Sequence, residues 1–273
     1  MVTSISFFIA GHQDDALLFR GEFLQTDVNT PGARVVHIVT TAGDNGWQPS
    51  WWQAREAGLV AAHNRAQAPD QYPTAVRKKF HRNVTVYDTP RWACYFLRLP
   101  DGNLRGQGFA RTGYVSLVWL RNDKNRRMKA IDVTGNVPDS TYSWADVQAT
   151  LRAIMNHELA KLTQNPRPPQ WFNMADNVAS TNPGDHFDHY ATTQAALLAG
   201  ATAHHRVLWV SYATAGRPAN LPAGLLAAKR TLFYTYADSV HAATGMGMDY
   251  FHNEWRQWGP KSYARVARVR AAT

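Results

Sequence analysis

Short apolar runs alternate with longer amphipathic stretches along the chain, and this alternation predicts strands and helices in turn. Residues 4–10 (SISFFIA) and 34–40 (RVVHIVT) are rich in β-branched and aromatic side chains, which favours buried strands. Between them, residues 15–28 place leucine and phenylalanine at helical spacing, ahead of the breaker Asn-Thr-Pro-Gly at 29–32. We therefore expect a strand–helix–strand unit in this part of the chain.

The same alternation continues toward residue 211. The alanine-rich stretch 51–66 predicts a helix, and Ser143 with Asp146 fits a capping box that opens a helix running to about residue 162. Further strands are expected at 84–87, 93–99, 170–173 and 206–211, with a helix at 189–203. The pattern predicts an α/β fold of Rossmann-like type: a mostly parallel, doubly wound sheet with helices on both faces. Its ligand site should lie at the carboxyl ends of the strands.

The sequence contains no internal repeat, no low-complexity segment and no change of composition typical of a linker. We therefore expect a single domain over residues 1–273. Residues 103–140 are rich in Gly, Arg and Asn, which predicts a long excursion from the sheet. Within it, VSLVWL at 115–120 fits a short strand or a short helix equally well.

The amino-acid composition excludes several classes of protein. With 45% hydrophobic and 18% charged residues, the chain is a folded protein rather than a disordered tail. The net charge of +9 would attract anionic partners. The basic run at 121–129 lacks the interleaved aromatic residues of a nucleic-acid module, so we expect no nucleic-acid partner. The single cysteine, Cys94, excludes an internal disulfide and a cysteine-based zinc site.

The N-terminal residues carry no basic leader and no small-residue cleavage signature. No apolar run reaches the roughly 18 residues that a membrane span requires. We expect a cytoplasmic protein, or the processed form of a secreted one, with no membrane span. The sequence does not fix its oligomeric state.

Two clusters of histidine and aspartate lie where strands of the predicted sheet end. Residues 11–15 (GHQDD) follow the first strand, and residues 185–189 (DHFDH) come just before a helix, between two later strands. A zinc hydrolase needs about three nitrogen or oxygen ligands and an open position for water. His12, Asp15 and His189 could supply those ligands.

The remaining residues of the two clusters suggest a mechanism. Asp14 could take the proton of a metal-bound water, and a cationic His186 could stabilise the oxyanion and protonate the leaving amine. Asp188 could orient one of the imidazoles. Either cluster alone is more often a helix cap or a surface turn, but two of them at independent strand ends favour a metal site. The other histidines lack a carboxylate-rich context, which predicts structural or surface roles for His37, His63, His81, His157, His204 and His205.

The two clusters also resemble a known family. GHQDDALLF and GDHFDHYAT look like the two signature motifs of the PIG-L-type (LmbE-like) zinc-dependent deacetylases, which remove the acetyl group from substrates that contain N-acetylglucosamine. TTAGD followed by WWQAREAGLVAA, and LRLPDGNL, resemble two further segments of that family in the same order. The similarity spans residues 4–198, and the C-terminal part matches only loosely.

The resemblance implies the metal ligands, base and acid named above, and it adds substrate contacts from Asp44, Arg55 and Asp101. Taken alone, Asp101 is an ordinary turn residue of a Pro-Asp-Gly segment, and Arg55 fits a solvated helix face. The chain departs from the family pattern at Gln13, where proline is common, and at Ala16, where an acidic residue is common. Neither residue is an expected metal ligand, so these two differences from the family pattern affect the expected substrate preference and not the metal site.

The sequence thus predicts a zinc-dependent amidohydrolase that removes the N-acetyl group of an amino sugar in a sugar conjugate, a glycolipid or a glycosylated metabolite. It would hold one Zn²⁺ per chain, although two histidines and one aspartate also accept iron, cobalt or nickel. The alternatives are hydrolysis of another N-acyl group, and a metal-free carbohydrate-binding protein on the same scaffold. Trp47, Trp51 and Trp52 follow the second strand and could stack on a sugar ring or an apolar aglycone.

Overall fold

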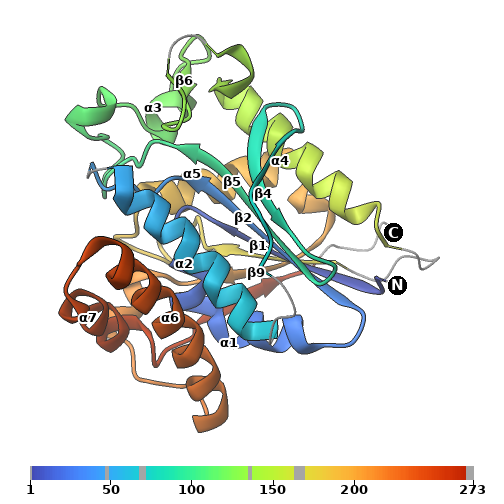
Figure 1. The fold of residues 1–273 in the computed structure, drawn as a ribbon, viewed down its shortest axis with the longest axis vertical. Helices are drawn as coiled ribbons and strands as arrows, with labels where there is room; N and C mark the ends of the chain where they lie inside the picture. The colour runs from blue at the N-terminus through green and yellow to red at the C-terminus, as the bar shows by residue number, and fades with distance from the viewer. Residues whose placement is uncertain (1, 47–48, 68–71, 135–136, 163–169, 269–273) are drawn as a thin grey trace.

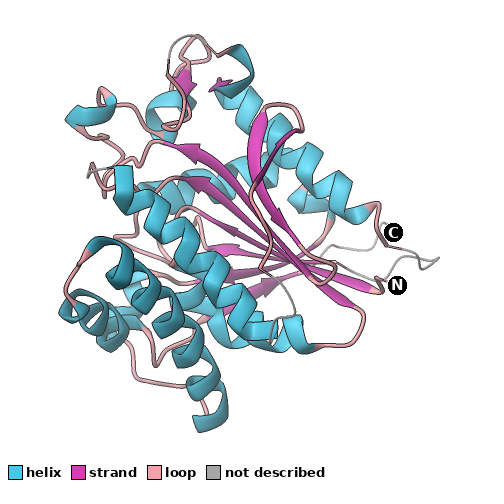
Figure 2. Cartoon of the chain, in the orientation of Figure 1, coloured by secondary structure: helices cyan, strands magenta, loops and turns pink. Residues whose placement is uncertain are grey.

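The computed structural model describes residues 2–46, 49–67, 72–134, 137–162 and 170–268. A mixed sheet runs through the centre of these residues, with helices on both of its faces (Figures 1 and 2). Its strand order is β10-β9-β8-β1-β2-β5-β4-β3. The strands are β1 (Ser4–Ala10), β2 (Ala33–Thr41), β3 (Val76–Lys79), β4 (Asn83–Asp88), β5 (Trp92–Leu99), β8 (Trp171–Ala175), β9 (His205–Trp209) and β10 (Ala264–Ala267). A separate small ladder pairs β6 (Met128–Lys129) with β7 (Thr141–Tyr142).

The five central strands of the large sheet are parallel, and β10, β4 and β3 add antiparallel edges. The predicted α/β fold with a mostly parallel sheet is therefore confirmed. From β1 the chain proceeds to β2 on one side and later returns to β8 on the other. This reversal is a topological switch point, where such sheets open a crevice at the carboxyl ends of their strands.

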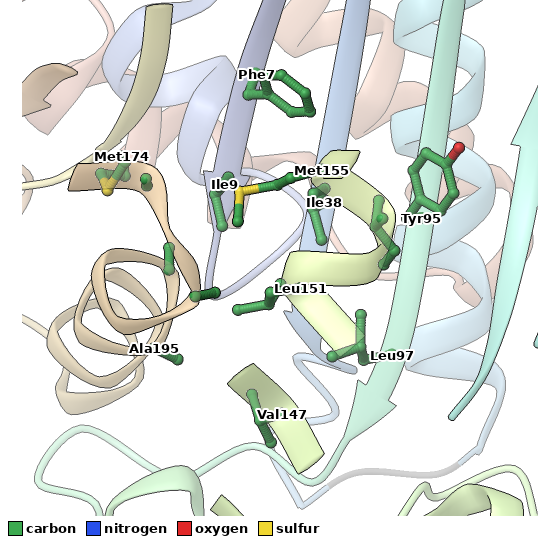
Figure 3. Close-up of a cluster of buried hydrophobic side chains, with 14 of the residues drawn as sticks. Phe7, Ile9, Ile38, Tyr95, Leu97, Val147, Leu151, Met155, Met174 and Ala195 are labelled. Atoms are coloured by element: carbon green, nitrogen blue, oxygen red, sulfur yellow. The ribbon is translucent and has the colours of Figure 1, made fainter. Parts of the chain in front are cut away.

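Two apolar layers hold the helices against the sheet. One face is covered by α1 (Asp15–Asn29), α2 (Pro49–Gln67) and α6 (Ala223–Thr244), with α7 (Met248–Trp258) packed beside them. The other face is covered by α4 (Trp144–Leu159) and α5 (Phe187–Ala199), with the short α3 (Leu117–Arg121) at their end. Figure 3 shows this second layer, in which side chains of β1, β2, β5 and β8 meet Val147, Leu151 and Met155 of α4 and Ala195 of α5. Short 3-10 turns lie at Ala110–Thr112, Pro138–Ser140, Ala201–Ala203 and Tyr212–Gly216.

Local signals explain the helix boundaries. Ser143 Oγ accepts a hydrogen bond from the Asp146 amide at 3.1 Å, and Asp146 Oδ2 accepts one from the Ser143 amide at 2.8 Å, so the expected capping box is present. The helix ends at residue 159 rather than near 162. The helix expected to begin at residue 189 begins at 187, because the His186 side chain caps it. The ambiguous segment 115–120 contributes to helix α3.

None of the helices in the described ranges is long and apolar enough to cross a membrane. Cys94 is buried in β5 as a free thiol.

Two of the histidines outside the predicted site form a buried pair. His37 of β2 and His63 of α2 are both fully buried, and His37 Nδ1 lies 3.1 Å from His63 Nε2. Burial lowers the pKa of His37 to about 3 and also lowers the pKa of His63 well below its usual value. The folded protein therefore keeps both rings neutral, which agrees with the structural role expected of them.

This pair should make the fold sensitive to acid. The unfolded chain takes up a proton at each histidine below a pH near 6.5, whereas the folded chain does so only near pH 3 for His37. The free energy of unfolding should therefore fall between pH 7 and pH 5, by about 2 kcal/mol per histidine. Denaturant titrations of a His37→Leu/His63→Met variant should show a shallower pH dependence than the parent protein. His252→Gln, on the exposed part of α7, should not change it, and identical slopes in all three proteins would contradict the prediction.

Candidate metal centre

The two predicted clusters meet at the switch point of the sheet. β1 ends at Ala10, and the next residues turn into α1, with the His12 amide donating to Asp15 Oδ2 at 2.8 Å. The second cluster follows β8 and opens α5. Gly11 permits the close approach of these segments, because a Cβ there would lie 3.1 Å from the His189 ring. Segments 177 residues apart in sequence are thereby brought into contact.

The three expected ligands lie close together. His189 Nε2 lies 3.0 Å from Asp15 Oδ1 and 3.3 Å from His12 Nδ1, and His12 Nδ1 lies 3.6 Å from Asp15 Oδ1. Ligand atoms held about 2.0–2.2 Å from a tetrahedral zinc ion are about 3.3–3.6 Å apart. All three residues are buried. The spacing and the donor types therefore fit a divalent cation.

Carboxylates lie behind both imidazoles, and the one behind His189 is within hydrogen-bond distance of its ring. Asp185 Oδ1 lies 2.8 Å from His189 Nδ1, and the Asn182 amide group donates to Asp185 Oδ2 at 2.7 Å. On the far side of the other ring, His12 Nε2 lies 3.3 Å from Asp188 Oδ2, which accepts the Gly102 amide at 2.8 Å. Metal-binding histidines characteristically have such a partner on the second ring nitrogen. Asp185 belonged to the predicted cluster but had no predicted role.

The electrostatics of the cluster favour a positive charge. Burial opposes the charged form of His189, but Asp15 and Asp185 outweigh it and raise the pKa of His189 to about 10. Burial likewise opposes protonation of His12, yet Asp101 and Asp15 raise its pKa well above the usual value. The pKa of Asp15 is held well below its usual value, against burial, by His189 and His12. A cation bound between these side chains would replace the protons that they otherwise attract.

A second group of possible ligands shares His12 and includes Asp101, His186 and Asp188. It uses the opposite nitrogen, since His12 Nε2 lies 3.6 Å from Asp101 Oδ2. His186 Nε2 lies 3.7 Å from Asp101 Oδ1. His186 Nδ1 already accepts the Asp188 amide at 3.2 Å. The donor atoms of the first group lie closer together, and its His189 is held from behind by Asp185.

Asp14 belongs to neither ligand group. It lines the cavity beside the first group, and the Arg55 Nη2 group donates to its Oδ1 atom. Arg55 also donates from Nη1 to the Gly43 carbonyl at 2.7 Å and from Nε to the Tyr236 hydroxyl at 2.8 Å. The arginine expected to contact substrate thus lines the cavity and also holds the Asp14 carboxylate.

The other two expected substrate contacts, Asp101 and Asp44, differ in their position relative to the cavity. Asp101 lines the same cavity as Asp14, beside His12 and His186. Asp44 does not line it: its Oδ1 atom accepts the Asp101 amide at 2.8 Å, and it borders a larger cavity of about 980 Å³. Asp44 therefore fixes the backbone that presents Asp101.

The cavity over the metal centre has a volume of about 190 Å³. Of the three tryptophans considered from sequence, Trp51 lines this cavity, Trp52 lines the larger one, and Trp47 lies outside the described residues. C-terminal residues that no motif had indicated complete its wall: Tyr212, Tyr250, Glu254 and Trp258. Their only sequence signal is the four-residue spacing of the last three, which places them on one face of a helix.

No protein-family model matches the chain, and no curated protein is significantly similar to it in sequence. Among solved structures, the zinc inhibited form of teicoplanin deacetylase Orf2 is 17% identical over 98% of this chain and 100% of its own, with a TM-score of 0.49. A deacetylase–teicoplanin complex is 18% identical over 97% and 98%, with a TM-score of 0.47. GalB, the 4-carboxy-2-hydroxymuconate hydratase of Pseudomonas putida, is 10% identical over 99% and 98%, with a TM-score of 0.49.

Metal analysis can decide which ligand group binds. We expect about one equivalent of zinc per chain after loading, lost in His189→Ala and retained in His186→Ala, because only the first group contains His189. Asp185→Asn should weaken zinc binding roughly ten- to a hundred-fold in competition with a chelating dye. His252→Ala, which alters an exposed histidine, serves as the control. Loss of zinc in His186→Ala with retention in His189→Ala would assign the metal to the second group instead.

Proposed function

We propose that the protein is a metal-dependent hydrolase that removes the N-acetyl group from a substrate containing N-acetylglucosamine. The observation that carries this proposal is one small cavity lined by Asp14, His186 and two members of a possible three-residue ligand set, His12 and Asp15, whose third member is His189. The resemblance of the segments around these residues to the PIG-L-type deacetylases supports the choice of an acetylated amino sugar.

In this proposal His12, Asp15 and His189 hold one divalent cation. Two histidines and one carboxylate suit zinc, and they also suit other first-row metals. The cation would supply Lewis-acid activation of a water molecule and of the substrate carbonyl. The remaining chemistry belongs to the side chains around it.

Asp14 acts as the general base. Its carboxylate takes a proton from the attacking water as the water oxygen bonds to the amide carbon, and it passes that proton to the nitrogen as the carbon–nitrogen bond breaks. The products are acetate and the free amine. Arg55 holds Oδ1 of this carboxylate in place from α2, so the base is positioned before substrate arrives.

His186 acts as a hydrogen-bond donor to the oxygen of the tetrahedral intermediate. Its Nδ1 atom accepts the Asp188 amide, which leaves the proton on Nε2, beside Asp101. Burial, with the positive charge of His12, lowers the pKa of His186 to about 4. We therefore assign it a neutral ring that donates from Nε2, in place of the cation expected from sequence.

Acetate release tests the proposed function directly. Zinc-loaded protein should release acetate from N-acetylglucosamine or its glycosides, lose this activity to a chelator and regain it with added zinc. Sugar binding that is insensitive to the chelator, with no acetate formed, would replace the hydrolase by a carbohydrate-binding protein.

Replacing the base should separate chemistry from metal binding. Asp14→Asn keeps the size of the side chain but removes its basicity, so kcat should fall at least about a hundred-fold while zinc content is unchanged. Asp249→Asn on the surface of α7 is the matched control and should keep full activity. Full activity in Asp14→Asn would remove this residue from the role of base.

A further inference from the structure

Helix α7 presents one face to the catalytic cavity. Tyr250, Glu254 and Trp258 lie on successive turns of this helix, and all three line the cavity. Trp258 stacks on Tyr212 with ring centroids 4.9 Å apart and an angle of 16° between planes. Tyr212 in turn meets the His189 ring edge-on at 5.5 Å. The helix face therefore reaches the neighbourhood of the metal centre.

Glu254 is the group on this face that lacks a full set of partners. Its Oε2 atom is shielded from solvent and has no hydrogen-bond partner among the described residues. A buried acceptor without a donor is costly, and a ligand that brings a donor removes this cost. Burial and the nearby Asp14 carboxylate raise the pKa of Glu254 to about 8, while Arg55 and a hydrogen bond with Tyr250 act in the opposite direction.

The charges around the cavity limit the kind of ligand that could donate a hydrogen bond to Glu254. Its described lining includes one arginine and four carboxyl groups, which belong to Asp14, Asp15, Asp101 and Glu254. Arg55 is already engaged by Asp14, Gly43 and Tyr236. Although the whole chain carries +9, an anionic group in this cavity would meet the carboxylates of Asp14 and Asp101. Uncharged hydrogen-bond donors, with an apolar face for the aromatic side chains, match the cavity best.

We propose that Glu254 is a specificity-determining residue, which accepts hydrogen bonds from the ring hydroxyl groups of an uncharged N-acyl amino sugar while Trp258 and Tyr212 form the adjoining aromatic wall. This inference rests on the proposed function and deepens it. It assigns substrate choice to α7, whereas the chemical step belongs to residues that follow β1 and β8.

The test compares two N-acetylated substrates that differ in their hydroxyl groups. N-acetylglucosamine offers ring hydroxyls to Glu254, whereas N-acetylcyclohexylamine has the amide and the ring without them. For Glu254→Ala, kcat/KM on the sugar should fall roughly ten- to a hundred-fold, mainly through KM, and change less than about three-fold on the cyclohexyl compound. Glu254→Gln keeps one acceptor oxygen and should recover part of the loss. Gln257→Ala, exposed on α7, is the control.

Each outcome bears on one proposal or the other. An equal fall of kcat/KM on both substrates in Glu254→Ala would make Glu254 a structural residue. Equal kcat/KM of the wild-type protein on both substrates would also overturn the inference. Neither result would contradict the proposed hydrolase. If neither substrate yields acetate, the proposed function fails, and calorimetric titration of N-acetylglucosamine into zinc-loaded protein decides the inference. Binding that is lost in Glu254→Ala and kept in Gln257→Ala would support it, and binding that is absent or unaffected would overturn it.

Discussion

The position of His12 between two sets of carboxylates is the constraint on which the site depends. Its Nδ1 atom faces Asp15 and His189, and its Nε2 atom faces Asp188 and Asp101. One ring thereby ties the turn after β1 to the start of α5. The sheet makes this possible, because β1 lies next to β8 and the chain leaves both strands at the same edge. The fold therefore determines the chemistry of the cavity through this single ring.

The buried histidines and aspartates of the site are stable only when each charged side chain has a hydrogen-bond or ion-pair partner. Asp185 is held by Asn182, Asp188 by the Gly102 amide, and Asp14 by Arg55. These supports come from different segments, so the site is built by the tertiary structure rather than by either motif alone. Such support keeps reactive side chains in fixed orientations before a substrate binds.

What the sequence could predict follows from how local each feature is. The candidate ligands lie in two contiguous motifs beside recognisable strands, so their meeting at one edge of the sheet could be predicted from strand order, whereas their role as ligands stays a prediction. The exposed strand β3 (VRKK) has no apolar periodicity and was not anticipated. The orientation of Asp44 toward the Asp101 amide depends on two loops meeting, which no spacing encodes. The place of Glu254 in the cavity could not be predicted for a similar reason. Glu254 is far from Asp14 in the sequence, and only the tertiary structure brings the two side chains close together.

The path of the chain between β9 and β10 places α7 outside the parallel part of the sheet. These strands are antiparallel neighbours, and α6 and α7 lie in the long connection between them. The Tyr236 hydroxyl of α6 accepts a hydrogen bond from Arg55, which also holds Asp14, whereas α7 meets the cavity through side chains one turn apart. None of the α7 side chains that line the cavity belongs to a possible ligand group of the described residues. Substitutions on one helix would therefore reshape the wall of the cavity while the residues that follow β1 and β8 keep their places in the fold.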